Sequence, residues 1–338
     1  MIDAFEGLDR VGWPDLRHAY GPAGDVPGQL RGLRSSDQAT RDWAAFELMG
    51  NVYHQGGRWP ASQHVVPFLV ALVDDPATPD RAGVAQLLRA IALGDRSDHD
   101  LPFSPTATFT AAGAVTPAQE ARCLAARDGT DDEWDSARAI ADAEACAHKW
   151  DRDAYLAAGR HLGRYARWVA DPDPDLAARA AELLAWFPTT PATIVALIAM
   201  PPDPTRWQPR ASANLTLAHL PAEVPGRTAA EQGPGGQAKG WPGGTDRTAA
   251  EQGPGRQANG WPGVTEGLRA QLHAVPSPVR LTAAIALAYQ LGDRLPAAAV
   301  DVLATAGRDD APEEEVVVPW HRSLTSFAEL ARKRLGLT

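Results

Sequence analysis

The 338-residue sequence contains little cysteine and few β-branched residues. Two cysteines cannot build a disulfide framework, so nothing in the sequence marks an oxidising compartment. Valine and isoleucine together number 26, against 64 alanines. Because alanine is the best helix former and β-branched residues favour strands, this imbalance argues against a β-sandwich, a β-barrel or a Val/Ile-rich parallel sheet.

Long hydrophobic runs and an excess of basic residues are also missing. No stretch of 18 apolar residues occurs, so we expect no membrane span. Residues 1–10 lack a basic region followed by an apolar run, so we expect no signal peptide and a cytoplasmic protein. The 42 acidic and 32 basic residues give a net charge of -10, which argues against non-specific binding to nucleic acid or an anionic membrane.

A tandem duplication is the clearest internal feature. Residues 227–246 read RTAAEQGPGGQAKGWPGGTD and residues 247–266 read RTAAEQGPGRQANGWPGVTE, identical at 16 of 20 positions. The two copies contain 10 of the 30 glycines. Since such a composition buries too little apolar surface to form a core, we expect a disordered Gly/Pro-rich loop insertion over residues 223–266.

The rest of the sequence contains the start signals and apolar periodicity of a series of helices. A hydroxyl residue followed by proline, as at Thr116-Pro117 and Thr190-Pro191, can cap a helix whose first position the proline takes. Thr116 and Gln119 also have the spacing of a capping box. The helices expected from these signals and from apolar periodicity span residues 26–35, 38–53, 62–74, 79–92, 117–127, 132–149, 152–169, 174–186, 191–200, 209–219, 266–274, 278–291, 296–306 and 321–335.

Several of these helices form helix–turn–helix units of similar design. The three clearest units cover residues 37–72, 171–200 and 277–307. When they are aligned, Arg41 and Arg280 share a position, and Ala44 and Ala283 follow three residues later. The middle unit has Ala177 where the arginine is expected. This pattern resembles the HEAT repeats of the short bacterial kind named for phycobilisome-lyase relatives, and residues 16–27 and 51–69 are also similar to such bacterial proteins.

The resemblance implies an all-α fold, a right-handed α-solenoid of antiparallel helix pairs, and it implies no biochemical activity. In a solenoid each unit contacts only its neighbours, so the length does not require a second domain. We therefore expect N-terminal and central repeats over residues 1–222, the insertion over 223–266, and C-terminal repeats with a capping helix over 267–338 of the same domain.

Two groups of residues are candidates for a binding surface. The first group surrounds an expected Gly56-Gly57 turn and consists of Asn51, Tyr53, His54, Gln55, Arg58 and Trp59. Aromatic and amide side chains suit an interface, and they suit the closing of a solenoid cap equally well. The second group, Arg160, Arg164 and Arg167, is expected along one face of one helix. These arginines can bind an anion or an acidic partner, or pair with acidic side chains of the same chain.

The 11 tryptophans also lead to expectations about burial. Trp43, Trp168 and Trp186 occupy positions expected to face neighbouring helices. The tryptophans that flank helices, where they can be exposed or can staple the helix ends, are Trp13, Trp59, Trp207 and Trp320. For most of this second group we favour stapling.

No catalytic residue, metal site or cofactor is expected. The sequence has no serine elbow and no His-Glu-x-x-His motif, and Cys123, Cys146 and His148 lack the second close pair of a zinc site. We expect a monomeric, non-catalytic scaffold for protein–protein interaction, whose partner is another protein. The alternative is an enzyme or nucleic-acid-processing protein on the same scaffold, as in the HEAT-like alkylpurine DNA glycosylases. That alternative requires a basic channel across a concave face.

Overall fold

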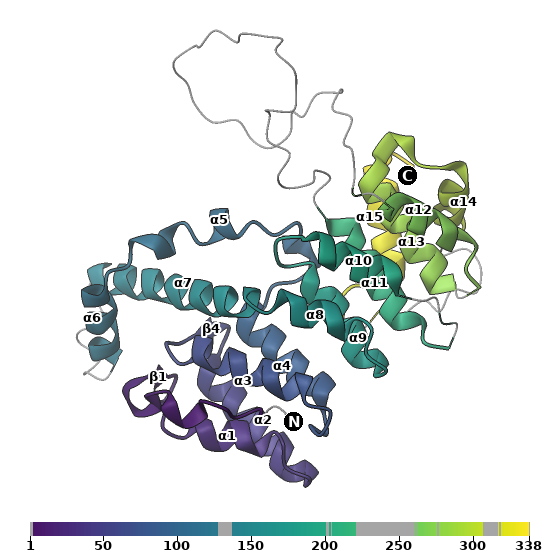
Figure 1. The fold of residues 1–338 in the computed structure, drawn as a ribbon. Helices are drawn as coiled ribbons and strands as arrows, with labels where there is room; N and C mark the ends of the chain where they lie inside the picture. Colours follow the sequence, from purple (N-terminus) through teal and green to yellow (C-terminus); the bar gives the residue numbers. More distant parts are fainter. Residues whose placement is uncertain are drawn as a thin grey trace, which may run out of the picture.

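The structure is a computed structural model that describes residues 3–127, 137–200, 203, 205–220, 261, 263–275, 277–306, 317 and 319–337. It is mostly helical, at 69% helix, which confirms the all-α prediction (Figure 1). The α-helices are α1 (Val26–Gly32), α2 (Gln38–Val52), α3 (Ser62–Asp74), α4 (Arg81–Leu93), α5 (Pro105–Thr108), α6 (Pro117–Arg127), α7 (Ala137–Gly159), α8 (Leu162–Trp168), α9 (Pro174–Leu184), α10 (Pro191–Ala199), α11 (Trp207–His219), α12 (Val264–Ala270), α13 (Ser277–Leu291), α14 (Ala297–Thr305) and α15 (Leu324–Arg334). Two small hairpins pair β1 (Arg17–His18) with β2 (Gly21–Pro22) and β3 (Tyr53–His54) with β4 (Gly57–Arg58). None of the described helices is long and apolar enough to cross a membrane.

The local signals for helix starts are confirmed at two sites. At α6 the Thr116 N–H donates to Gln119 Oε1 at 3.0 Å, and the Gln119 N–H donates to Thr116 Oγ1 at 3.2 Å. This reciprocal pair is a capping box. At α10 the Thr190 hydroxyl oxygen accepts from the Thr193 N–H at 3.2 Å. In both helices the proline takes the first position, where its missing N–H costs nothing.

The prediction of two helices over residues 132–149 and 152–169 is wrong in its boundary. Helix α7 continues past Trp150 to Gly159, and the chain then turns before α8 begins at Leu162. Trp150 and Tyr155 of α7 are both buried, so one continuous helix brings both into the core. The turn instead lies next to Gly159, the residue that fits most easily at a helix end.

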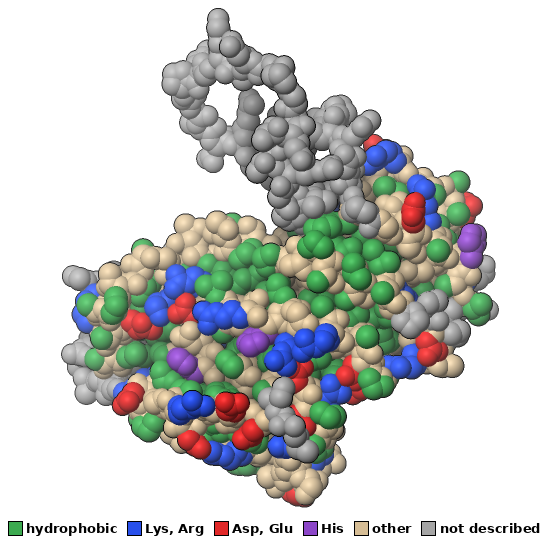
Figure 2. All heavy atoms as spheres, in the orientation of Figure 1, with side chains coloured by type: hydrophobic (Ala, Val, Ile, Leu, Met, Phe, Trp, Pro, Cys, Tyr) green, Lys and Arg blue, Asp and Glu red, His purple; other side chains and the backbone are tan. Residues whose placement is uncertain are grey.

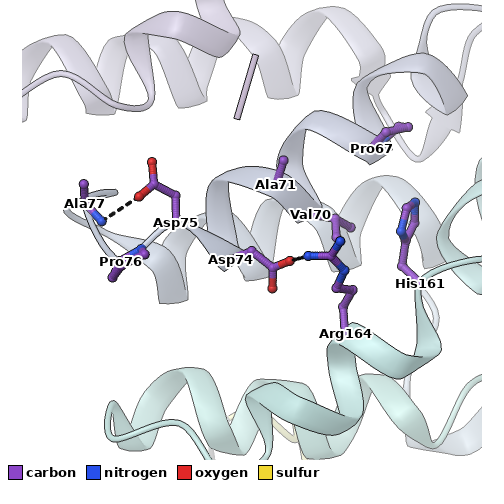
Figure 3. A pocket seen from close by; sticks show the side chains of 9 residues that line it. All are labelled: Pro67, Val70, Ala71, Asp74, Asp75, Pro76, Ala77, His161 and Arg164. Atoms are coloured by element: carbon purple, nitrogen blue, oxygen red, sulfur yellow. Dashed lines mark hydrogen bonds and ion pairs between the residues drawn. The ribbon is translucent and has the colours of Figure 1, made fainter. Parts of the chain in front are cut away.

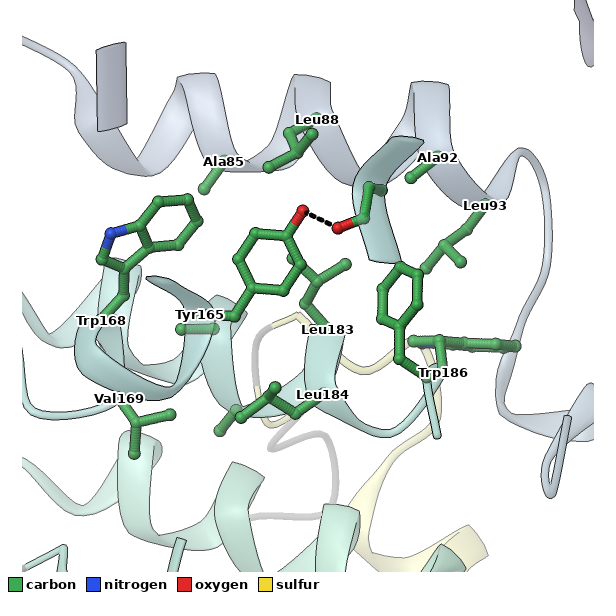
Figure 4. Packing of buried hydrophobic residues seen from close by; sticks show 14 of the residues in the cluster. Ala85, Leu88, Ala92, Leu93, Tyr165, Trp168, Val169, Leu183, Leu184 and Trp186 are labelled. Carbon is green, nitrogen blue, oxygen red and sulfur yellow. Dashed lines mark hydrogen bonds between the residues drawn. The ribbon is translucent and has the colours of Figure 1, made fainter. Parts of the chain in front are cut away.

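The helices are arranged in successive packed layers. Helices α1 to α4 lie together in the lower part of Figure 1, α7 crosses above them, and α9, α11 and α13 follow one another toward α15 at the far end. One hydrophobic cluster runs through the described elements from Ala4 to Ala331. Figure 4 shows part of it, where α8 and α9 pack on α4 and the Tyr165 hydroxyl donates to the Ala158 carbonyl at 2.8 Å.

Arginines near the starts of several helices donate to backbone carbonyls at, or just after, the C-terminus of the preceding helix. Arg41 donates to the Ser35 carbonyl at 2.9 Å, and Arg280 donates to the Ala274 carbonyl at 2.9 Å. These are the two arginines that occupy one position in the sequence alignment. Such bonds satisfy backbone oxygens that a helix C-terminus leaves without intrahelical partners.

Two arginines that the sequence alignment did not include make the same kind of contact. Arg81 of α4 donates to the Val73 carbonyl at 2.6 Å. The fully buried Arg210 of α11 donates to the Leu197 carbonyl at 2.8 Å and to the Met200 carbonyl at 3.1 Å. A recurrent arginine contact therefore joins successive helices.

The end of the expected insertion lies inside the fold. Trp261 is 7% exposed, Val264 is buried, and α12 begins at Val264. Both residues belong to the second copy of the duplication, so the expected boundary at residue 266 is too late. Residues 221–260, which contain most of the expected insertion, lie outside the described part of the chain.

Candidate functional site

The first group of candidate residues runs from the last turn of α2, through the β3–β4 hairpin, to Trp59 directly after it. His54 pairs with Gly57, so the two-residue turn is Gln55-Gly56 and not the expected Gly56-Gly57. Gln55 and Gly56 have φ angles of 48° and 83°, as a type I′ turn requires. The side chain of Gln55 is exposed at the tip of this hairpin, and His54 is half-buried with its Nδ1 3.2 Å from the hydroxyl of Tyr20.

The other four residues of this group point into the protein. Asn51, Tyr53, Arg58 and Trp59 are all buried. The Asn51 amide donates to Asp25 at 2.9 Å, and the Tyr53 hydroxyl donates to Asp95. The Trp59 ring stacks on Trp150 of α7, with 5.6 Å between the ring centroids. Their contacts lie within the chain, so these four side chains offer little surface to a partner.

Arg58 connects the hairpin to α7 through a buried ion pair. Its Nε lies 2.8 Å from Oδ1 of Asp151, and the side chain of Arg58 is 2% exposed. Burial lowers the pKa of Arg58 and raises the pKa of Asp151, and in each case the partner's charge opposes the effect of burial. Burial therefore disfavours the charged form of each side chain, and the opposite charge of its partner offsets part of that penalty.

The second group of candidate residues lies beside a pocket between α3 and α8. The pocket has a volume of about 360 Å³, at the lower end of the range of small-molecule sites. Figure 3 shows Arg164 and His161 extending from the α8 side toward α3. The residues that line it are Pro67, Val70, Ala71, Asp74, Asp75, Pro76, Ala77, His161 and Arg164.

The carboxylate of Asp74, at the end of α3, is contacted by three side chains of α8. Arg164 forms an ion pair with Asp74, and an Nη of Arg167 lies 3.8 Å from the same carboxylate. The indole Nε1 of Trp168 donates to Asp74 at 2.7 Å. Two arginines thus share one aspartate, and the side chains of Arg164 and Arg167 are still 40% and 63% exposed.

The remaining polar side chains that line the pocket are Asp75 and His161. Asp75 is paired with Arg34 at 2.7 Å. Arg160 is exposed in the turn between α7 and α8, so the prediction that it shares one helix face with Arg164 and Arg167 is wrong. Burial, reinforced by the charge of Arg160, lowers the pKa of His161, so its ring is neutral near pH 7.

The pocket therefore combines an apolar floor with a basic rim. Three arginines, at positions 34, 164 and 167, pair with two aspartates, at positions 74 and 75, in a chain whose net charge is -10, and the charge of Arg160 acts on His161 beside them. Figure 2 shows basic side chains gathered over α8 on this face of the molecule. Arginines that hydrogen-bond a carboxylate within the protein can also bind the carboxylate of a ligand.

The described part of the chain brings no group of three or more His, Cys, Asp or Glu residues together as metal ligands. Cys123 of α6 and Cys146 of α7 face one another, both buried as free thiols. Burial, with the neighbouring Cys123 thiol, raises the pKa of Cys146 to about 12. Because the thiolate is the reactive and metal-binding form, this thiol is chemically inert near pH 7.

Sequence reasoning identified Arg164 but missed Asp74 and His161. Asp74 ends α3, and its partners lie about ninety residues later in the chain. A local pattern cannot reveal this contact, because it depends on how α8 packs against α3. The only available signal was the arginine triplet itself, which needs acidic partners somewhere in the fold.

One of the expectations about tryptophan burial is wrong. Trp43, expected to face a neighbouring helix, is 64% exposed, whereas Trp168 and Trp186 are buried as expected. Of the helix-flanking group, Trp13, Trp59 and Trp320 are buried, which agrees with stapling. Trp43 is exposed because Ala44 and Leu48 form the inward face of α2.

Comparison with known protein families, curated proteins and solved structures finds no match to this chain.

Proposed function

We propose that this chain is a non-catalytic scaffold for protein–protein interaction, a right-handed solenoid of HEAT-like helix pairs that acts as a monomer in the cytoplasm. Support for the repeats comes from the arginine contacts that join successive helices, since Arg41 and Arg280 share both an alignment position and the same contact. Stacked helix pairs present extended surfaces that suit this role.

The partner segment in this proposal is acidic and binds at the pocket between α3 and α8. The observation that carries it is the sharing of Asp74 by Arg164 and Arg167, which leaves guanidinium groups only partly neutralised at the rim. An incoming carboxylate gains charge-assisted hydrogen bonds there, and an adjoining apolar side chain fits against Pro67 and Val70 of the floor.

A direct test measures the binding of a labelled Glu/Leu decapeptide by fluorescence anisotropy at low salt. We expect binding that weakens as salt is added, because the contact is electrostatic. The Arg164→Gln/Arg167→Gln variant should bind at least tenfold more weakly. A matched control is Arg10→Gln/Arg122→Gln, which removes two exposed arginines that also pair with acidic residues.

The same experiment distinguishes the nucleic-acid alternative. A labelled DNA duplex at low salt should not bind, since the acidic chain has no excess of basic residues to neutralise phosphates. If the duplex binds and the decapeptide does not, the acidic-partner proposal fails. If neither binds, or if the matched control loses as much affinity as the pocket variant, the pocket is not the binding site.

A further inference from the structure

Helix α2 carries two large aromatic side chains in solvent. Trp43 is 64% exposed and Phe46 is 68% exposed, and their ring centroids are 5.8 Å apart. Among the described tryptophans, Trp43 is the only one that is exposed; the others are buried or half-buried. An exposed aromatic pair of this size is typical of an interaction surface.

The pair belongs to a continuous stripe along the helix. Ala39, Trp43, Phe46 and Gly50 follow one another at spacings of four, three and four residues, which places them on one face. The opposite face contains the buried Ala44, Leu48 and Val52, which pack into the core. The stripe therefore faces away from the protein, on a helix of the outermost N-terminal layer (Figure 1).

Acidic side chains flank the stripe on both sides. At 100° per residue, Asp42 lies about 70° from the centre of the stripe in one direction and Glu47 about 70° in the other. Neither carboxylate forms a hydrogen bond or an ion pair with the described residues. The nearest basic residue along the helix, Arg41, instead donates to the Ser35 and Ser36 carbonyls.

We propose that the outer face of α2 (Ala39, Trp43, Phe46 and Gly50, flanked by Asp42 and Glu47) binds an amphipathic helix of a partner protein that has an aliphatic face with lysine or arginine on both sides. Apolar side chains of that helix cover Trp43 and Phe46, and its cations pair with the two carboxylates. A Cβ added to Gly50 would have no neighbour within 4 Å, so a partner backbone can approach closely at this end.

A second copy of this chain fits the surface less well. In a twofold-symmetric pairing of α2 with α2, the Asp42 and Glu47 carboxylates of one copy lie near those of the other, and like charges repel. The chain as a whole also has a net charge of -10, which disfavours self-association and favours a basic partner.

The test uses the full chain and a fluorescein-labelled, 18-residue peptide of leucine and lysine in an amphipathic helical pattern. We expect binding that weakens with salt. Trp43→Ser/Phe46→Ser should weaken it at least tenfold. Asp42→Asn/Glu47→Gln should weaken it about threefold to tenfold and should flatten its dependence on salt. Tyr20→Ser, which removes another exposed aromatic ring, is the matched control and should change binding less than twofold.

Two further measurements make the outcome decisive. A peptide with glutamate in place of lysine, or with its leucines scrambled off one face, should not bind. The Arg164→Gln/Arg167→Gln variant should bind the leucine/lysine peptide as the wild type does, so failure at one surface is separated from failure at the other. Equal binding of the glutamate peptide, or unchanged binding by Trp43→Ser/Phe46→Ser, would overturn the proposal. A dimer in sedimentation that this double variant converts to a monomer would assign the surface to a second copy instead.

Discussion

The hairpin segment at residues 53–59 and the outer face of α2 are adjacent in the sequence and opposite in their environment. The hairpin residues Tyr53, Arg58 and Trp59 have the polar and aromatic character of an interface, and they are buried. Trp43 and Phe46 of α2 have the character of core residues, and they are exposed. Residue type does not decide exposure when distant elements supply the partners. Asp151 and Trp150 of α7 cover the hairpin, whereas no described element covers the outer face of α2.

The largest expected effect comes from breaking the ion pair beneath the hairpin. Arg58→Ala leaves the half-buried Asp151 carboxylate without its partner, and we expect the free energy of unfolding to fall by about 3–5 kcal/mol in urea denaturation. Arg58→Met/Asp151→Leu removes both charges, so it should lose much less. If the single and double variants are equally destabilised, the charge pair is not what anchors the hairpin.

A backbone position next to Arg58 gives the second effect. Gly94 has φ 70° and ψ -146°, and a Cβ there would overlap Nη1 of Arg58. We expect Gly94→Ala to lower the free energy of unfolding by about 2–3 kcal/mol. Gly50→Ala on the outer face of α2 is the contrasting control, since it meets no atom within 4 Å and should stabilise the helix by about 0.5–1 kcal/mol. If Gly94→Ala and Gly50→Ala both lower the free energy of unfolding, or both raise it, the two positions do not differ in packing as the structure shows.

The Tyr53 hydroxyl gives a smaller and pH-dependent effect. Tyr53→Phe removes its hydrogen bond to Asp95, and we expect a loss of about 1–2 kcal/mol at pH 7. Burial, with the hydrogen bond to Asp95, raises the pKa of Tyr53 above its ordinary value of 10.0. Because the folded state holds this proton more tightly, the stabilisation is complete below pH 10 and is lost as the pH rises above 10.

Circular dichroism at alkaline pH measures this linkage. The difference in the free energy of unfolding between the wild type and Tyr53→Phe should be constant from pH 7 to about pH 9 and should shrink above pH 10. A difference that grows above pH 10 would show that Tyr53 is not held in its protonated form.

The smallest expected effect is at the outer face of α2. Trp43→Ser/Phe46→Ser should change the free energy of unfolding by less than about 0.5 kcal/mol per site, because both rings are already in solvent. Thermal denaturation followed by circular dichroism checks this directly. A loss as large as that of Arg58→Ala would mean that these rings stabilise the fold, and the contrast between the two regions would disappear.

Most of the helical architecture could be predicted from local signals. The capping box at Thr116 and Gln119 and the cap at Thr190 involve residues three positions apart, so the sequence contains all the partners. The boundary between α7 and α8 was missed, because the continuation of α7 through Trp150 depends on the burial of that ring against Trp59 of the hairpin.

The candidate site was predictable only in part. The spacing of the arginines at positions 160, 164 and 167 predicts three basic side chains on one helix face. The turn after Gly159 separates Arg160 from Arg164 and Arg167, which lie in α8. Asp74 joins the site from α3, through packing that no spacing in the sequence describes.

Local patterns along the chain are enough to predict an acidic, alanine-rich, all-helical protein and the starts of several of its helices, because helix propensity and capping act over three or four residues. Local patterns do not predict that Arg58 is buried, that Trp43 is exposed, or that Arg164 forms an ion pair with Asp74. Those outcomes depend on contacts between residues about ninety positions apart or, for Trp43, on the absence of a described covering element. Burial depends on which elements pack together, and packing is a property of the whole chain.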